Sequence, residues 1–266
     1  MATATEQADV IVLGAGIVGV SVALHLQERG KTVLLVDRGE PGAETSHGNA
    51  GLIERSSVIP YAFPRELSSL VRYSLNQQSD VRYSWRYLPK VAPWLFTYWQ
   101  NSSPTRLNQA ARAMLPLVQR CVDEHDALIE AAGMGHLIKA NGWIEVFRNQ
   151  PAFSTAQADA RALQPYGLRY EVLDGEQLRE REPSLSDQAV GGIHWLDPKT
   201  VSDPGALTRG YAALFIKRGG RFIQGDALTL KHFDGRWQVQ TEQGPVNAEQ
   251  AVIALGPQAP ELFKPL

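Results

Sequence analysis

The stretch Asp9-Val-Ile-Val-Leu-Gly-Ala-Gly-Ile-Val-Gly19 decides the fold. Its apolar, β-branched first half is typical of a fully buried parallel strand. Three glycines come directly after that half, and apolar residues then recur at helical spacing up to Leu26. Residues 31–37 form a second, largely apolar run that ends in a carboxylate. The pattern predicts a compact strand–helix–strand unit, with Gly30 ending the helix.

Each glycine of this stretch has a mechanical reason. Gly14 lets the chain turn sharply out of the strand, and Gly16 lets backbone N–H groups approach a pyrophosphate at the positive end of the helix. Gly19 lets the helix and the strand pack closely. Asp37, 23 residues after Gly14, stands where a ribose diol needs a hydrogen-bond acceptor. These residues predict a dinucleotide site, and the motif alone does not choose between NAD and FAD.

The segment 41–53 is rich in small and hydroxyl residues and favours FAD. FAD is the longer cofactor, and it needs further donors for its phosphates and a close backbone approach to its ring. Donors are available from Thr45, Ser46 and Asn49, whereas Ala50 and Gly51 allow the close approach. The alternative is an ordinary polar surface loop.

The last part of the sequence is predicted to return to the central sheet. Residues 251–256 form another buried strand that ends in Gly256, and strand-like runs at 221–224 and 237–240 precede it. The two domains are therefore expected to be interleaved, with the dinucleotide-binding domain at 1–56 and 200–266 and a substrate (cap) domain at 57–199.

Composition excludes several classes of protein. The 266 residues carry a formal net charge of −2 and no long basic run, so nucleic acid is not expected as a partner. The single cysteine, Cys121, allows no intrachain disulfide, and neither it nor the six histidines show metal-ligand spacing. The apolar run 10–26 is shorter than a membrane helix and lacks the flanks of a signal peptide. A reducing, cytoplasmic setting is expected.

Together these residues resemble the FAD-dependent oxidoreductases of the D-amino-acid oxidase superfamily, and most of all its D-amino-acid dehydrogenase branch. The block Thr45-Ser-His-Gly-Asn-Ala-Gly-Leu-Ile53 is its most specific part, and 201–204, 219–222 and 252–256 add to it. The resemblance implies an α/β fold, with a Rossmann-type, glutathione-reductase-like FAD-binding domain interleaved with an α+β substrate (cap) domain.

The resemblance also implies roles for single residues. Those expected at the pyrophosphate and the other phosphates are Gly14, Gly16, Gly19, Thr45 and Ser46. Those expected at the adenosine half are Asp37 on the ribose, Arg38 near the adenine, and Ala227, whose backbone meets the adenine. Those expected along the flavin are Asn49, Ala50, Gly51 and Leu52, with Gly256 closing against the cofactor.

The implied activity is oxidative deamination of D-amino acids to 2-oxo acids and ammonia, by hydride transfer from Cα to flavin N5, with oxygen or a quinone as electron acceptor. No catalytic side chain is assigned. The alternatives are a glycine or sarcosine oxidase, a 2-hydroxy-acid dehydrogenase, and a non-catalytic FAD-binding chain of a larger complex. The family pattern continues beyond Leu266, so a further C-terminal segment or a partner chain is expected to complete the enzyme.

Two segments have alternative interpretations. His47 is either a covalent flavin anchor or, as favoured here, an ordinary loop histidine. Residues 89–100 are dense in aromatic side chains. They form either a helix packed on the sheet, which is the favoured interpretation, or a surface that contacts the inner face of a membrane.

Overall fold

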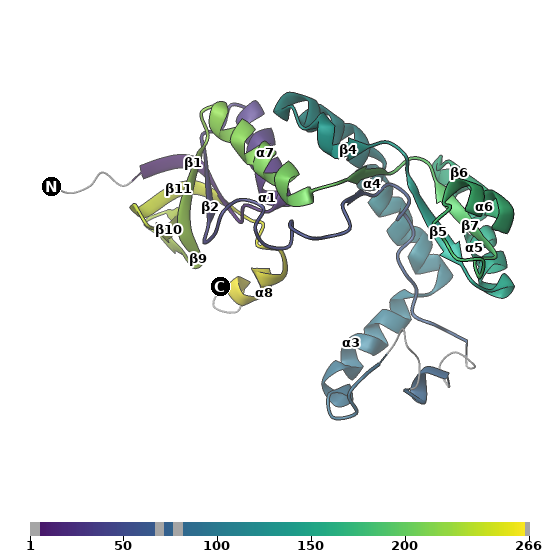
Figure 1. The fold of residues 1–266 in the computed structure, drawn as a ribbon. Coiled ribbons are helices and arrows are strands. Elements are labelled where there is room, and N and C mark those ends of the chain that lie inside the picture. The colour runs from purple at the N-terminus through teal and green to yellow at the C-terminus, as the bar shows by residue number, and fades with distance from the viewer. Residues whose placement is uncertain (1–5, 67–71, 77–81, 264–266) are drawn as a thin grey trace. The chain divides into compact units, whose positions relative to one another are not determined.

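The computed structural model describes residues 6–66, 72–76 and 82–263, and these divide into two compact units (Figure 1). The first unit contains Met1–Ile53, Asp123–Gly142 and Lys199–Leu266, and the second contains Glu54–Val122 and Trp143–Pro198. The predicted division at 1–56, 57–199 and 200–266 therefore needs a correction at 123–142. This segment belongs to the first unit, because the last part of helix α4 (Pro104–Ala132) and strand β4 (Ile138–Lys139) bond to elements there.

Four parallel segments form the main sheet of the first unit. Strand β1 (Glu6–Leu13) lies between β2 (Val33–Asp37) and β11 (Gly244–Ile253) and is parallel to both. The first residues of β9 (Arg221–Phe233) extend the sheet beyond β2. Hydrophobic residues on both faces of β1 are buried, as expected for a parallel strand covered from two sides.

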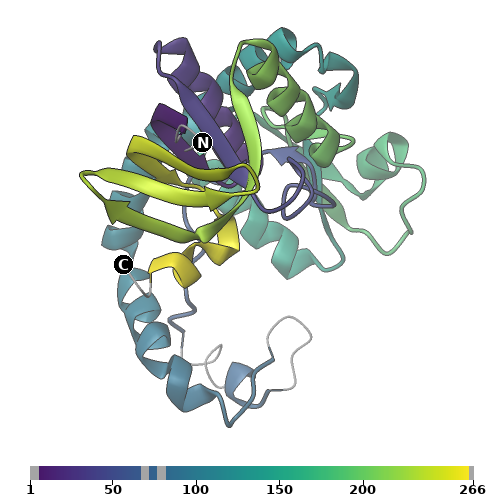
Figure 2. The ribbon, with the colours of Figure 1, turned by 90° about the vertical axis from the view of Figure 1, so that its left-hand side faces the viewer.

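An antiparallel hairpin closes this sheet. Strand β10 (Arg236–Thr241) pairs with the end of β9 and with the start of β11, which gives a closed ring in the order β1-β11-β10-β9-β2 (Figure 2). One hydrophobic core fills the ring, and its buried members include Ile11, Leu13, Val36, Ile223 and Val239.

Two helices, α1 (Ile17–Glu28) and α7 (Pro204–Lys217), pack on each other and on these strands (Figure 1). Val10, Val12 and Leu35, which alternate with the side chains of the ring core, are also buried. Tyr211 and Phe215 of α7 are fully buried. The central sheet is thus covered on one face by helices and on the other by the antiparallel hairpin.

A small second sheet belongs to the same unit. Its order is β3-β8-β4, with β3 (Leu52–Ile53) and β4 each antiparallel to β8 (Lys199–Val201). The short helix η1 (Gly135–Leu137) precedes β4, whereas η3 (Gly256–Gln258) and α8 (Ala259–Phe263) follow β11.

The second unit contains an antiparallel sheet in the order β5-β7-β6, with β5 (Trp143–Phe147), β6 (Tyr170–Asp174) and β7 (Gly191–Trp195). Around it the chain forms α5 (Gln150–Ala162), η2 (Gln164–Tyr166) and α6 (Gly175–Arg181). Phe153 of α5 packs with Ile193 and Trp195 of β7 in the largest core of this unit.

Helix α3 (Leu88–Asn101), also in the second unit, differs from the favoured interpretation. None of its side chains is buried, and Trp94 and Phe96 are 61% and 58% exposed. It is therefore not a helix packed into a core. Within the described ranges, no helix combines the length and the apolar character needed to cross a bilayer.

Candidate dinucleotide site

A cavity of about 470 Å³ lies in the first unit, where β1, β2 and β11 end. It brings together the glycine turn, the end of β2, the loop 44–49, part of β9 and the segment 253–261. The predicted site residues that line it are Gly14, Gly16, Asp37, Arg38, Thr45, Ser46, Asn49, Ala227 and Gly256. The carboxyl ends of parallel strands are the usual place for a ligand in an α/β sheet.

Two glycines of the turn, Gly14 and Gly19, have no room for a side chain. Gly14 has a φ of 104°, and a Cβ there would clash with the carbonyl oxygen of Ala254. A Cβ on Gly19 would overlap the carbonyl oxygen of Gly14. Gly19 does not line the cavity, so its part in the site is to let α1 approach β1 closely.

Asp37 is held by backbone groups on two sides. Its Oδ2 accepts the N–H of Ala15 at 2.6 Å and its Oδ1 accepts the N–H of Gly39 at 3.0 Å. Each carboxylate oxygen can accept more than one hydrogen bond, so the side chain can still receive a hydroxyl from a ligand. The residue lines the cavity at the end of β2.

Ser46 takes the place of a helix cap. Gly16, the N-cap of α1, has no side chain to bond the free N–H groups of the first turn. The Oγ of Ser46 accepts the N–H of Ile17 at 2.9 Å, and the side chain is buried. Because this bond uses Oγ as an acceptor, the hydroxyl hydrogen remains to donate to an anionic group at the helix N-terminus.

Besides the predicted Arg38, the cavity is lined by polar residues that were not predicted from the sequence, and Glu44 is the first of them. Arg38 and Glu44 form an ion pair at 2.8 Å, and the Glu44 carboxylate raises the pKa of the Arg38 guanidinium. Both side chains are more than half exposed, so the pair contributes little stability. Further polar lining residues are Asp226, Gln258 and Glu261. Each lies within five residues of Ala227 or Gly256 in the sequence, and this proximity to a predicted site residue could have indicated them.

The remaining predicted residues, Ala50, Gly51 and Leu52, do not line the cavity. The Asn49 side chain bonds within its own loop, because its Nδ2 donates to the Thr45 carbonyl at 3.2 Å and its Oδ1 accepts the Gly51 N–H at 2.8 Å. These bonds shape the loop in which Ala50 lies. Gly51 has a φ of 62°, and a Cβ on it would overlap the carbonyl oxygen of Val201 in β8.

His47 points toward α7. A Cβ built on Gly205, in the first turn of that helix, would lie 3.0 Å from the His47 Nδ1. His47 is not a lining residue of the cavity. This placement agrees with an ordinary loop histidine and gives no support to a covalent anchor.

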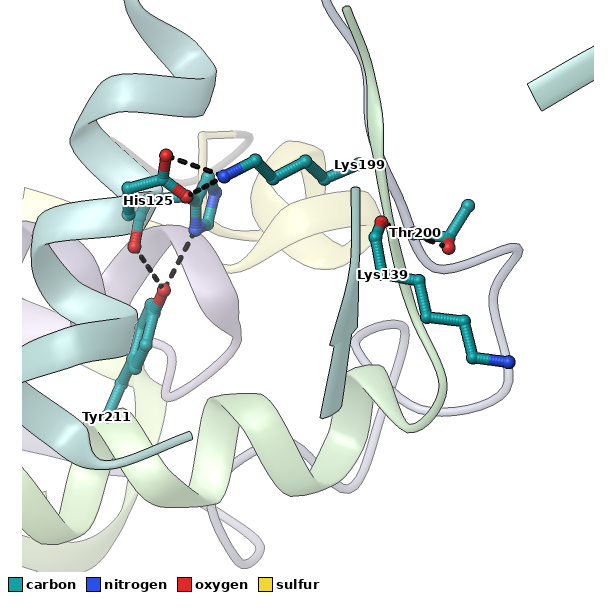
Figure 3. Close-up of polar contacts among 6 residues, drawn as sticks. His125, Lys139, Lys199, Thr200 and Tyr211 are labelled. Carbon is teal, nitrogen blue, oxygen red and sulfur yellow. Dashed lines mark hydrogen bonds and ion pairs between the residues drawn. The ribbon is translucent and has the colours of Figure 1, made fainter. Parts of the chain in front are cut away.

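A second polar cluster joins residues of β8, α4 and α7 (Figure 3). Nζ of Lys199 lies 2.7 Å from both carboxylate oxygens of Asp126, and the Tyr211 hydroxyl lies 3.0 Å from Nδ1 of His125. Burial lowers the pKa of His125 and raises that of Tyr211, so both are neutral at pH 7. No group of three or more metal-ligating side chains occurs within the ranges that the structure describes.

The residues at the cavity fit FAD. A helix N-terminus with a spare hydroxyl donor suits a pyrophosphate, and the fixed Asp37 carboxylate suits a ribose diol. Gly14 and Gly16 line the cavity without side chains, so their backbone is open to a ligand there. The second polar cluster does not line this cavity.

Comparisons with known proteins indicate the same cofactor. The family described as "FAD dependent oxidoreductase" (DAO) matches residues 9–266. The chain is 31% identical to a D-amino-acid oxidase of Bradyrhizobium diazoefficiens and 32% identical to a D-amino acid dehydrogenase of a Methylobacterium species. Each alignment covers 97% of this chain and 62% of the relative, so the chain spans about three fifths of these relatives' length.

Solved structures show the same fold. The chain superposes on a glycine oxidase from Geobacillus kaustophilus with a TM-score of 0.67 at 18% identity, covering 97% of this chain and 58% of the other. A glycine oxidase from Bacillus cereus gives a TM-score of 0.63 at 23% identity, with 96% and 57% covered. At these identities the likeness carries the fold and not the substrate.

Proposed function

Because the chain belongs to the DAO family of FAD dependent oxidoreductases, we propose that it binds FAD in the cavity at the glycine turn and takes part in the oxidation of D-amino acids. The observation that carries the cofactor proposal is the convergence of the glycine turn, Asp37 and the Ser46 loop on one cavity. The D-amino acid is proposed because the curated relatives near 30% identity are named for it.

Each part of the cavity has a proposed role. The N-terminus of α1 and the Ser46 hydroxyl hold the pyrophosphate, and Asp37 accepts a hydroxyl of the adenosine ribose. Arg38 and the backbone of Ala227 lie at the adenine, and Gly256 closes against the cofactor. The loop from Asn49 to Leu52, of which Asn49 lines the cavity, is proposed to support the flavin ring beside it.

Bound FAD supplies the two-electron oxidation, and the protein binds and orients it. The amino acid loses two electrons and two protons to become an imino acid, which water hydrolyses to a 2-oxo acid and ammonia. The electrons leave to oxygen or to a quinone. No step of this reaction requires a side-chain base if the amine arrives deprotonated, and we assign none.

The experiment is anaerobic reduction of the flavin in the FAD-loaded protein. D-amino acids should bleach the oxidised flavin band, and their L-enantiomers should not. Reduction by glycine or sarcosine alone would assign the protein to an oxidase of those substrates, and reduction by 2-hydroxy acids alone would assign it to a dehydrogenase. FAD binding with no reduction by any of these would favour a non-catalytic chain of a larger complex.

A second proposal concerns residues 82–101, the segment that contains α3, which we infer contacts an anionic membrane surface. Trp85, Trp94 and Phe96 are 63%, 61% and 58% exposed. Residues 82–101 carry Arg82, Arg86 and Lys90 and no acidic residue. Exposed aromatic side chains beside cations are typical of segments that lie in the interface of a bilayer with negative lipids.

Sedimentation with vesicles tests this contact. The protein should bind vesicles that contain phosphatidylglycerol and not vesicles of phosphatidylcholine alone, and salt should weaken the binding. The double variant Trp94→Ala/Phe96→Ala should lose most of it. A matched control is Phe233→Ala, a 62% exposed aromatic residue of β9. Equal binding to both vesicle types, or no effect of the α3 variant, would contradict the proposal.

A further inference from the structure

The segment from Ser46 to Leu52, which contains the loop proposed to support the flavin, is fixed at both ends. At its start, Ser46 is bonded to the N-terminus of α1 through the Ile17 N–H. At its end, the Gly51 carbonyl accepts the N–H of Val201 at 2.6 Å, and the two backbones touch where a Cβ on Gly51 would sit. The path of the loop is therefore set by α1 on one side and by strand β8 on the other.

Strand β8 also fixes the residues that follow the loop. Leu52 pairs with Thr200 and Ile53 pairs with Lys199, in an antiparallel ladder of only two residue pairs. So short a ladder is weak on its own, because three or more longer strands are needed for an independently stable sheet. The position of β8 must come from other contacts.

Strand β8 also pairs with β4, and Lys199 adds an ion pair. Its Nζ lies 2.7 Å from both Asp126 oxygens, and the two side chains are 24% and 43% exposed (Figure 3). Asp126 is well placed because the neighbouring His125 bonds Tyr211, which is fully buried in α7. On the other side of β8, the Thr200 hydroxyl bonds the Lys139 carbonyl at a longer distance of 3.4 Å.

We propose that Lys199 is a positioning residue for the flavin: through its ion pair with Asp126 it holds β8, and through β8 it holds the loop from Asn49 to Leu52. This inference rests on the proposed FAD site. The glycine turn and Asp37, proposed to bind the ADP half, bond to neither Lys199 nor Asp126. Loss of the pair should therefore act on the flavin half of the cofactor and spare the ADP half.

The test compares two ligands on the apoprotein, FAD and ADP-ribose. Lys199→Met and Asp126→Asn should each weaken FAD binding by about two- to fivefold, the range of a partly exposed ion pair, and leave ADP-ribose binding unchanged. The double variant should be no weaker than either single variant, because both remove the same contact. The visible spectrum of the bound flavin should shift in all three, which a general loss of stability would not cause.

Lys139→Met is the matched control. Lys139 lies on the adjacent strand, and its backbone carbonyl, rather than its ammonium group, makes the contact drawn in Figure 3. It should bind both ligands like the wild type. Unchanged FAD binding and spectrum in the Lys199 and Asp126 variants would overturn the inference, as would an equal loss for both ligands. A wild-type protein that binds no FAD would overturn the proposed function instead.

Discussion

The carboxylate of Asp37 accepts the backbone N–H of Ala15 at 2.6 Å, and this bond ties the end of β2 to the turn after β1. The residue proposed to bind the ribose is therefore also a brace for the turn proposed to bind the pyrophosphate. Its orientation is fixed before any ligand arrives, so binding costs no side-chain entropy at this position.

Replacing Asp37 by alanine should weaken FAD binding. A charge-assisted hydrogen bond to a ribose hydroxyl contributes about 1.5–3 kcal/mol, so the dissociation constant should rise by roughly 10- to 150-fold. Titration of the apoprotein with FAD, followed by flavin fluorescence, measures it. Asp234→Asn in the β9–β10 turn is the control and should leave the constant unchanged. A wild-type dissociation constant in Asp37→Ala would rule out the ribose role.

Gly19→Ala should destabilise the fold itself. The new Cβ would overlap the Gly14 carbonyl oxygen, so α1 would have to move away from β1, at a cost of about 1–3 kcal/mol or more. Thermal unfolding followed by circular dichroism measures the effect. Gly135→Ala is the matched control, because a Cβ there meets no atom within 4 Å. Equal melting temperatures for the two variants would show that the helix approaches the strand less closely than the structure has it.

Ser46→Ala should have two separable effects. Without FAD it leaves the Ile17 N–H without its acceptor, which should lower the free energy of unfolding by about 1 kcal/mol. With FAD present the loss should be larger, because the hydroxyl donor to the pyrophosphate is also gone. Ser154→Ala, in an exposed position of α5, should change neither value. An identical loss with and without FAD would place the Ser46 hydroxyl outside the phosphate contacts.

The stability of the protein should fall in mild acid because of His125. Burial lowers its pKa in the folded state below the ordinary 6.5, so below that pH the unfolded state binds more protons than the folded state. The contribution is present above about pH 6.5, the ordinary pKa of His, and is lost as the pH falls through the lower folded-state pKa of His125. Urea unfolding at about pH 7.5 and about pH 5.5 measures the difference.

In that experiment His125→Gln should show a smaller pH dependence than the wild type. His136→Gln, an exposed histidine in η1, is the control and should keep the wild-type pH dependence. If His125→Gln also keeps it, another group is responsible for the acid sensitivity.

The strand–helix–strand unit could be predicted because its strands are buried on both faces. Such strands appear in a sequence as unbroken apolar runs, as at 10–13 and 33–36. The later strands could be predicted only in part. In β9, burial beyond Gln224 follows no period of two, because Ala227 and Leu230 are buried whereas Leu228 and Phe233 are exposed, so only the portion parallel to β2 could be predicted.

The domain boundary inside α4 left no signal in the sequence. The helix runs from Pro104 to Ala132 without a break, and no glycine or proline marks the division at 122 and 123. Glu44, Gln258 and Glu261 were missed for a related reason. They come from a loop and a short terminal segment, and only the closed ring of strands brings them to one cavity.

The closed ring of strands also determines how late during synthesis β1 and β2 obtain all their pairing partners. Strand β1 acquires β2 as a neighbour early, but its other edge pairs with residues 246–253, and β2 itself waits for residues 221–224. A ribosome adds about 5–20 residues per second, so it needs roughly 10–40 s to synthesise the stretch between the end of β2 and the end of β11. During this time two apolar strands with open edges are outside the tunnel, and such edges template aggregation. We expect the nascent N-terminal segment to depend on chaperones that shield strand edges until β11 emerges.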